Sequence, residues 1–234
     1  MPVNVHGQPV GEPVIDWQPR PQPGRTAMQG AVCRLEPLDV ARHGASLFDA
    51  YAQAPDGRDW TYLPIERPTD RDAFTKEFAT RERMRDPLHY AIVVGGRAVG
   101  TAALMRIDPG NGVMEIGHIA FAPVLQKTRA GTEAIALLMR RSFDELGYRR
   151  LEWKCDSLNE PSRRAAERLG FTFEGIFRKA VVTKGRARDT AWYSITSDEW
   201  PMIIRALDRW LRPDNFDAAG RQRVPLARLR SEQP

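Results

Sequence analysis

Apolar residues recur at two spacings along this chain, one typical of strands and the other of helices. The first strand-like segments are residues 31–38, 88–94, 97–107 and 113–121. Only short turns separate the last three, because Gly95-Gly96 favours a hairpin and residues 108–112 are a cluster of turn residues. The pattern therefore predicts three consecutive antiparallel strands.

Helix-like segments lie between the first two of these strands. Asp39 is a suitable N-cap for a helix over residues 40–54. Thr69 or Asp70 is a suitable N-cap for a second helix. The residues between the two helices are rich in aromatic and turn residues, so we expect a loop there.

A strand, a polar loop, a helix and another strand follow one another over residues 113–156. The helix is amphipathic, since its apolar residues recur at spacings of three and four, and Gly147 is a suitable C-cap. The second strand alternates, with Leu151, Trp153 and Cys155 on one face. A unit of this length requires a right-handed crossover, so its two strands should pair in parallel.

The polar loop of this unit, Gln126–Thr132, lies where a strand passes into the N-terminus of a helix. Free backbone N–H groups and the positive end of the helix dipole meet at such a position, which suits it to bind an anion. An ordinary solvated turn is the alternative interpretation.

The last third of the chain predicts a short helix, two strands and a final helix. Asn159 is a candidate N-cap for the short helix, and Gly170 ends it. Ser197 is the predicted cap of the final helix. The predicted organisation is an extended arm rich in Pro and Gly (residues 1–30), one domain (31–212) and a loose basic tail (213–234).

The composition is ordinary for a globular protein of 234 residues, with 42% hydrophobic and 28% charged residues. No apolar run approaches the ~20 residues of a membrane helix, and the first residues do not resemble a signal peptide, so we expect a cytoplasmic protein. Cys33 and Cys155 are far apart, which argues against a disulfide framework or a metal site. The net charge of +5 comes from scattered arginines, which favours an acidic cosubstrate over nucleic acid.

Several motifs resemble those of the GNAT superfamily of acyl-CoA N-acyltransferases, in particular its ribosomal-protein N-terminal acetyltransferase branch. They are RLEPL at Arg34, EIGHIAF at Glu115, LNEPSRRAAERLGF at Leu158 with FEGIFR after it, and AWYSI at Ala191. The order of the predicted elements is similar as well, from about Arg34 to about Trp200. The resemblance implies an α/β (α+β) fold, in which helices flank a mixed, mostly antiparallel twisted sheet with a splayed central pair of parallel strands.

The resemblance implies acetyl-CoA as the cofactor and the polar loop as the site of its pyrophosphate. In the family, this loop reads Gln or Arg, two residues, Gly, one residue, and Gly or Ala. Here Arg129 stands at the first Gly position, while Gly131 matches the second and would let the chain approach the pyrophosphate closely. The implied loop ligands are Gln126, Lys127, Thr128, Arg129, Ala130, Gly131 and Thr132. The backbone that would pair with the pantetheine arm is that of Ile119, Ala120 and Phe121.

Glu115 is the leading candidate for the general base, acting through a water molecule, since the family often places a glutamate on this strand. Alternation puts it on the same face as Gly117 and Ile119. An ion pair at the strand edge is the alternative interpretation. His118, on the opposite face, has a suitable ordinary pKa for a base, although a strand histidine is often packed or paired.

The resemblance also implies roles for three residues of the short helix. Asn159 would hydrogen-bond a pantetheine amide, Ser162 would face the sulfur, and Arg163 could reach a phosphate of CoA. A simple N-cap, an incidental first-turn residue and a solvated helix face are the respective alternatives.

The acyl acceptor is less well defined by the sequence. Candidate residues of its pocket are Trp60, Tyr62, Tyr90, His118, Arg188, Asp189 and Trp192. Asp189 could attract a protonated amine, but it could equally be a turn residue, and Trp60 and Trp192 could belong to the core. We expect direct attack on the thioester by a primary amine of a small molecule or of a protein or peptide N-terminus. The alternative is a non-catalytic acyl-CoA-binding sensor, and the family and the arm favour a homodimer.

Overall fold

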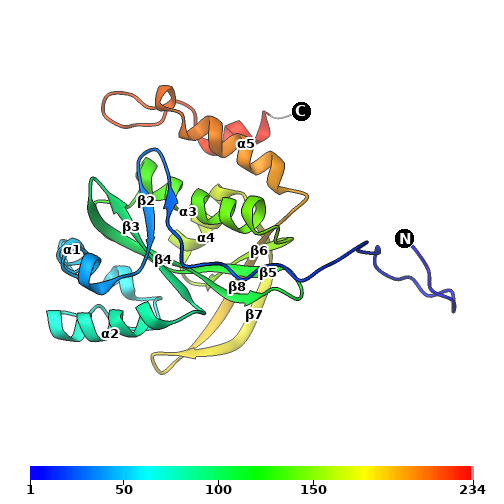
Figure 1. Ribbon diagram of the computed structural model, residues 1–234, viewed down its shortest axis with the longest axis horizontal. Coiled ribbons are helices and arrows are strands. Elements are labelled where there is room, and N and C mark those ends of the chain that lie inside the picture. The colour runs from blue at the N-terminus through cyan, green and yellow to red at the C-terminus, as the bar shows by residue number, and fades with distance from the viewer. Residues whose placement is uncertain (233–234) are drawn as a thin grey trace.

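An eight-stranded sheet runs through the middle of the computed structural model, which describes residues 1–232 (Figure 1). The strands are β1 (Met28–Gln29), β2 (Arg34–Pro37), β3 (Leu88–Val94), β4 (Arg97–Asp108), β5 (Val113–Phe121), β6 (Arg150–Asp156), β7 (Thr172–Thr183) and β8 (Arg186–Thr196). Their spatial order is β1-β2-β3-β4-β5-β6-β8-β7, and every neighbouring pair is antiparallel except β5 with β6. The predicted mixed sheet with one central parallel pair is confirmed.

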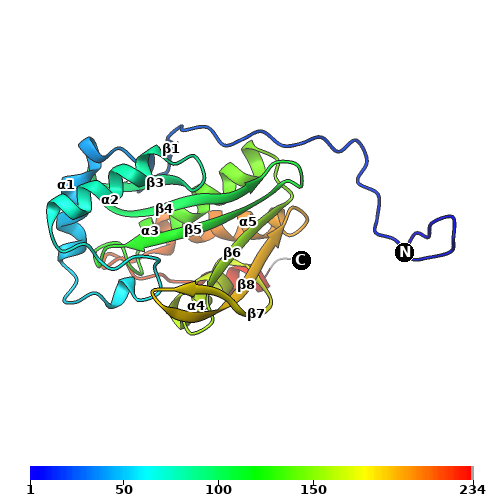
Figure 2. The same ribbon diagram turned by 90° about the horizontal axis from the view of Figure 1, so that it is seen from below.

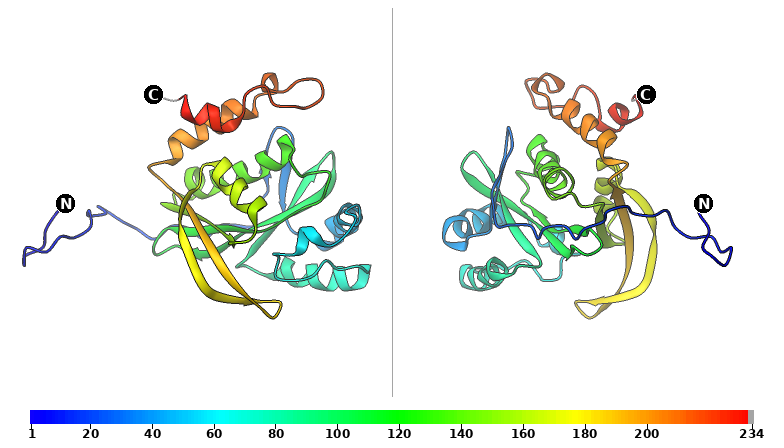
Figure 3. Two further views of the ribbon diagram at one scale, coloured as in Figure 1. Left: turned by 180° about the vertical axis from the view of Figure 1, so that it is seen from behind. Right: turned by 45° about the vertical axis from the view of Figure 1, so that its right-hand side comes forward.

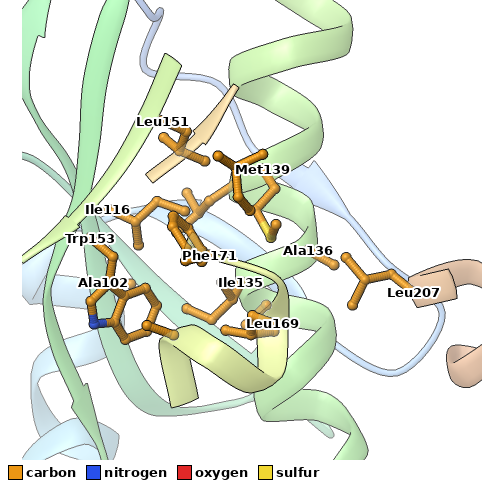
Figure 4. Packing of buried hydrophobic residues seen from close by; sticks show 14 of the residues in the cluster. Ala102, Ile116, Ile135, Ala136, Met139, Leu151, Trp153, Leu169, Phe171 and Leu207 are labelled. Carbon is orange, nitrogen blue, oxygen red and sulfur yellow. The ribbon is translucent and has the colours of Figure 1, made fainter. Parts of the chain in front are cut away.

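Helices cover both faces of the sheet (Figure 2). They are α1 (Val40–Ala52) and α2 (Arg71–Arg83) on one face, and α3 (Arg129–Arg140), α4 (Glu160–Leu169) and α5 (Trp200–Leu211) on the other. Each face has its own hydrophobic core. The α3 face is the larger, and there Ile135 and Met139 of α3 lie over Ile116, Leu151 and Trp153 of the sheet (Figure 4).

Three predicted helix starts are confirmed by hydrogen bonds of their caps. The side chains of Asp39, Asp70 and Asn159 each accept a hydrogen bond from the backbone of the first turn that follows. The predicted cap at Ser197 is wrong, because α5 begins at Trp200. Glu199 precedes it and its carboxylate instead accepts hydrogen bonds from the backbone and hydroxyl of Thr196, at 2.8 and 2.9 Å.

A β-bulge interrupts β5 at His118. Gly117 pairs with Ala103 and Ala120 with Thr101, so β5 has one residue more than β4 in this interval, and φ of His118 is 48°. An extra residue exchanges the two faces of the strand beyond it. The prediction that Glu115 and Ile119 share a face is therefore wrong: Ile119 packs on the α3 core, whereas Glu115 lies on the α1/α2 face.

The N-terminal arm projects away from the domain, and its first residues fold back on themselves through a bridge between Val3 and Pro9 (Figures 1 and 2). Trp17 fastens it: the indole N–H donates to Gly110 O at 2.8 Å, and the ring lies against the guanidinium groups of Arg20 and Arg149. Further along, the backbone N–H groups of residues 31–33 donate to the buried carboxylate of Glu133 in α3. The arm thus enters the domain across α3.

The segment after α5 is folded, so the prediction of a loose tail is wrong. It contains a short 3-10 turn (Pro213–Asn215) and α6 (Leu226–Ser231), which pack beside α4 and α5 (Figure 3). Leu226 and Leu229 are buried at 1% and 5% exposure and belong to the α3 core. Two leucines three residues apart form an apolar stripe that the many arginines around them obscure in the sequence.

Within residues 1–232, no helix combines the length and the apolar character that crossing a membrane requires. The same residues contain no group of three or more His, Cys, Asp or Glu side chains placed to hold a metal ion.

Candidate active site

The parallel strands β5 and β6 separate part-way along their length. They pair only where Val113, Met114 and Glu115 face Arg150, Leu151 and Glu152. Beyond Glu115, β5 continues its ladder with β4, and β6 continues its ladder with β8. One edge of each strand therefore loses its partner beyond this point, and a gap opens in the middle of the sheet with Glu115 at its apex.

The loop after β5 presents unpaired backbone donors at the start of α3. Thr128 is the N-cap, and its hydroxyl accepts the N–H of Gly131 at 3.1 Å. Among residues 1–232, the N–H groups of Lys127, Arg129 and Ala130 have no hydrogen-bond acceptor. Three free donors at the positive end of a twelve-residue helix fit an anionic ligand.

The side chain of Gln126 is occupied within the protein. Its amide donates to Phe121 O at 3.1 Å and to Asp59 Oδ2 at 3.0 Å. Gln126 therefore holds the loop against the end of β5 and the α1–α2 connection, rather than extending its side chain to a ligand as the sequence predicts.

Gly131 has a packing role inside the protein. A Cβ atom at this position would lie 2.9 Å from Leu125 O and 3.1 Å from a ring carbon of Phe121. The missing side chain thus lets the first turn of α3 pack against its own loop, and the Cβ direction points into the protein. A substitution of Gly131 would disturb the loop whether or not a ligand binds there.

Arg129, which departs from the family pattern, is bound to the C-terminal part of the chain. Its guanidinium donates to Leu211 O, the last residue of α5, and lies 5.4 Å from the ring centroid of Phe216. A second arginine bridges the same elements, since Arg168 of α4 donates to Thr132 Oγ1 and stacks on Trp210. The Arg129 side chain therefore leaves the loop amides uncovered.

Glu115 is 4% exposed and lies at the apex of the gap. Its Oε2 is 3.1 Å from Lys154 Nζ and 3.1 Å from Arg106 Nε. Burial raises the pKa of Glu115 above its ordinary value, although the charges of Lys154 and Arg106 oppose the shift. A buried, paired carboxylate with a raised pKa can accept a proton more readily than an exposed one.

This arrangement matches known acetyltransferases along most of the chain. The family model described as the acetyltransferase (GNAT) domain matches residues 34–172, more than half of the sequence. This chain belongs to the GNAT acetyltransferase family.

Individual GNAT proteins agree with this assignment. The crystal structure of a GCN5-related N-acetyltransferase from Brucella melitensis is 46% identical, has a TM-score of 0.91, and covers 92% of this chain and 99% of its own. The prophage-derived, uncharacterized N-acetyltransferase YokL of Bacillus subtilis is 30% identical over 128 residues, 54% of this chain and 72% of YokL. An acetyl transferase from Salmonella typhimurium that modifies the N-terminal serine of ribosomal protein L7/L12 is 20% identical, with a TM-score of 0.62 and coverage of 73% and 99%, which shows a shared fold alone.

Lys154 lies at the centre of the candidate site, although the sequence pattern does not single it out. Its side chain is 7% exposed, and its ammonium lies between the carboxylates of Glu115 and Glu152 and 3.8 Å from the ring centroid of Trp192. The alternation of β6 does place Glu152 and Lys154 on one face. The alternation does not indicate that the Lys154 side chain is buried.

Both histidines next to the apex are neutral at pH 7. His118 lies 5.2 Å from the fully buried His89, ring centroid to ring centroid, on the α1/α2 face. The prediction that His118 and Glu115 lie on opposite faces is therefore wrong, because His118 is the bulge residue of β5. Burial, followed by nearby arginines, lowers the pKa of His118 to about 4, and burial lowers that of His89 to about 3. With its pKa lowered so far, His118 is a weaker candidate for the base than Glu115.

The helix α4 uses the predicted cofactor residues for local bonds. Asn159 Oδ1 accepts the N–H of Ser162 at 3.2 Å, which leaves its side-chain amide group for other partners. Ser162 Oγ accepts the indole N–H of Trp153 at 2.9 Å. Arg163 donates to the hydroxyl of Tyr193 and to Ser157 O, so its guanidinium is bound to β8 and to the residue that follows β6.

Three of the predicted acceptor residues have structural roles. Tyr90 is fully buried in the α3 core and its hydroxyl donates to Gly24 O, so it lies on the wrong face of the sheet. Trp60 is 2% exposed and packs edge to face on Tyr51 in the α1/α2 core. Asp189 accepts the backbone N–H of Lys179 at 2.6 Å across the β7–β8 hairpin.

Two more of the predicted acceptor residues, Tyr62 and Trp192, lie around the gap. Trp192 of β8 stacks on Phe177 and covers Lys154. Tyr62 donates its hydroxyl to Leu158 O at 3.1 Å, which joins the α1–α2 connection to the turn before α4.

Proposed function

We propose that this chain is an acetyl-CoA-dependent N-acetyltransferase that transfers the acetyl group directly to a primary amine. The observation that carries the proposal is the gap between β5 and β6, which has Glu115 at its apex and the free amides of the Gln126–Thr132 loop at its open end. A thioester in this gap would lie between an anion site and a buried carboxylate.

The residues of the gap fit the cofactor. The amides of Lys127, Arg129 and Ala130 would bind the pyrophosphate, since backbone donors at a helix start bind phosphate without a metal. Ala122 N–H donates to Val99 of β4, and alternation along a strand then directs the N–H groups of Ile119 and Phe121 into the gap. These two donors are available to the pantetheine amides and to the thioester carbonyl.

Acetyl transfer to an amine needs a base for the amine, a donor for the carbonyl oxygen and a proton for the departing thiolate. Glu115 would take the amine proton, directly or through water. The N–H of Ile119 or Phe121 would stabilise the oxyanion. Ser162 would stand near the sulfur, with Trp153 holding its oxygen in place. The amine nitrogen forms the new C–N bond as the C–S bond breaks, and the thiolate leaves as CoA thiol.

The acceptor classes that this site supports are a small-molecule amine and a protein or peptide N-terminus. The second class is the one that the Salmonella typhimurium structure represents. Both would bring a primary amine to the face of the sheet that carries Glu115, which is 4% exposed.

A thiol-release assay with acetyl-CoA and a panel of amines tests the proposal, together with mass spectrometry for the added ~42 Da of one acetyl group on the amine. We expect turnover with at least one amine class and its loss in Glu115→Gln. Tight acetyl-CoA binding without turnover of any amine would support a non-catalytic sensor instead. Absence of acetyl-CoA binding would contradict the proposal altogether.

A further inference from the structure

Three polar side chains of β8 each contain a buried nitrogen or oxygen atom that has no hydrogen-bond partner in the described part of the chain. These atoms are Arg188 Nε, Thr190 Oγ1 and Trp192 Nε1. Thr190 is only 5% exposed. A buried donor without an acceptor costs about 1–3 kcal/mol, so three on one strand indicate a ligand that supplies the acceptors.

These side chains share the face of the sheet that carries Glu115. Positions two apart on a strand point the same way, and the intervening Ala191 and Tyr193 belong to the α3 core. Trp192 pairs with Lys154 across the ladder, and the Lys154 ammonium contacts both the Trp192 ring and Glu115. The unpartnered donors therefore form one continuous surface with the apex of the gap.

The chemistry of this surface favours an anion. Arg188 has no carboxylate within salt-bridge distance in the described part of the chain, whereas Arg106 of β4 and Arg150 and Lys154 of β6 are all paired. A guanidinium and a hydroxyl two residues apart can both donate to one carboxylate, and arginine is the side chain best suited to bind that group.

The α1–α2 connection is bound to the tip of the β7–β8 hairpin and to the turn before α4. Lys184, at the tip of the β7–β8 hairpin, donates to Trp60 O at 2.8 Å and is 3.1 Å from Glu66. On the opposite side, Tyr62 is bound to Leu158 O. These contacts hold residues 60–66 of the connection against the hairpin and the turn before α4, so we expect the surface to suit a small molecule better than a long peptide.

We propose that the acceptor is a small amine that also carries a carboxylate, as a free amino acid does, and that Arg188 and Thr190 bind this carboxylate. The inference rests on the proposed acetyltransferase activity. The amine would lie toward Glu115, with Trp192 between the two ends. The carboxylate takes no part in the reaction: the amine nitrogen loses a proton and gains the acetyl group, and the product is an N-acetyl amino acid and CoA thiol.

Matched acceptors that have or lack the carboxylate test whether the site recognises this group. The twenty amino acids would be compared with their α-amides, with the corresponding decarboxylated amines, and with dipeptide amides that have the same first residue. We expect at least one amino acid to be acetylated with kcat/KM about 10- to 100-fold above its three matched compounds, the range for a hydrogen bond to a charged group.

Arg188→Met should remove that advantage by raising KM for the amino acid while leaving KM for acetyl-CoA unchanged. Thr190→Val should act in the same direction with a smaller effect. Arg186→Met is the matched control, because Arg186 lies on the same strand and is exposed, so the amino acid should keep its advantage.

Two results would overturn the inference while leaving the acetyltransferase activity intact. One is a peptide or a decarboxylated amine acetylated as well as or better than every amino acid. The other is an Arg188→Met variant that changes KM for acetyl-CoA instead of KM for the acceptor, which would assign Arg188 to the cofactor. Failure of the proposed function itself is a different outcome, in which no compound of the panel releases CoA thiol.

Discussion

Glu115 combines two roles that the sequence presents as alternatives. It is ion-paired with Lys154 and Arg106, and it is also the buried carboxylate at the point where the sheet opens. Burial raises its pKa while the two cations lower it, so the neighbours set the pH at which it becomes a base.

Lys154→Met should move the acidic limb of the kcat/KM profile to higher pH. The Lys154 cation favours the ionised form of Glu115, so its loss raises the pKa of Glu115 further and extends the pH range in which the base is protonated and inactive. The kcat/KM profile between pH 4 and 9 measures the limb. Arg106→Met is the comparison, with a smaller shift, since Arg106 is 60% exposed and screened by solvent. An unmoved limb in Lys154→Met would mean that another group acts as the base.

Ser162→Ala should lower kcat by about 10²-fold and leave the Kd of acetyl-CoA nearly unchanged, because the hydroxyl serves the departing thiolate. It should also cost about 1–3 kcal/mol of stability, because Trp153 Nε1 loses its acceptor. Trp153→Phe removes that indole N–H and separates the two effects. If Ser162→Ala in the Trp153→Phe background keeps full kcat, Ser162 has only a structural role.

At the residue scale, three helix caps and the apolar face of β6 could be predicted, whereas the faces of β3 and β5 could not. Asp39, Asp70 and Asn159 bond to the turn beside them, so local sequence suffices. The sequence does not show that Tyr90, an acceptor-pocket candidate, faces the α3 core, because β3 is buried on both sides and its residues do not alternate between apolar and polar. Ile119 was misassigned because one bulge residue, His118, reverses the faces of β5 beyond it.

At the element scale, the loop and α3 form a unit that the sequence predicts as an anion site, and the structure changes how its residues contribute. The donors without an acceptor are backbone N–H groups, while Gln126, Gly131 and Arg129 make contacts inside the protein. Lys127 alone among the long side chains of the loop is exposed and has no partner within the described residues.

Lys127→Glu should therefore weaken acetyl-CoA binding about tenfold or more, because it replaces an attractive charge beside the pyrophosphate with a repulsive one. Calorimetry at two salt concentrations measures it, and the loss should shrink at high salt. Lys76→Glu carries the same charge change on the exposed face of α2 and should leave the Kd of acetyl-CoA unaltered. Equal effects of the two variants would place the pyrophosphate elsewhere.

At the scale of the whole molecule, the order of elements predicts the sheet and its central parallel pair, while the two ends of the chain escape prediction. The family pattern ends near Trp200, so nothing in it indicates that Leu226 and Leu229 complete the α3 core. The contacts that hold α6 join residues far apart in the sequence, so the local spacing of apolar residues does not predict them.

The bond from Arg129 to Leu211 joins the start of α3 to the end of α5. If the loop amides bind acetyl-CoA, the same residue takes part in the cofactor site and in the docking of the C-terminal segment, and the two equilibria become thermodynamically linked. Linkage is reciprocal, so the cofactor should slow amide hydrogen exchange and trypsin cleavage in residues 213–232, well away from the thioester. Arg129→Gly restores the family residue and should abolish this protection while acetyl-CoA still binds. Protection that persists in Arg129→Gly would show that cofactor binding is coupled to the C-terminal segment by contacts other than the Arg129–Leu211 hydrogen bond.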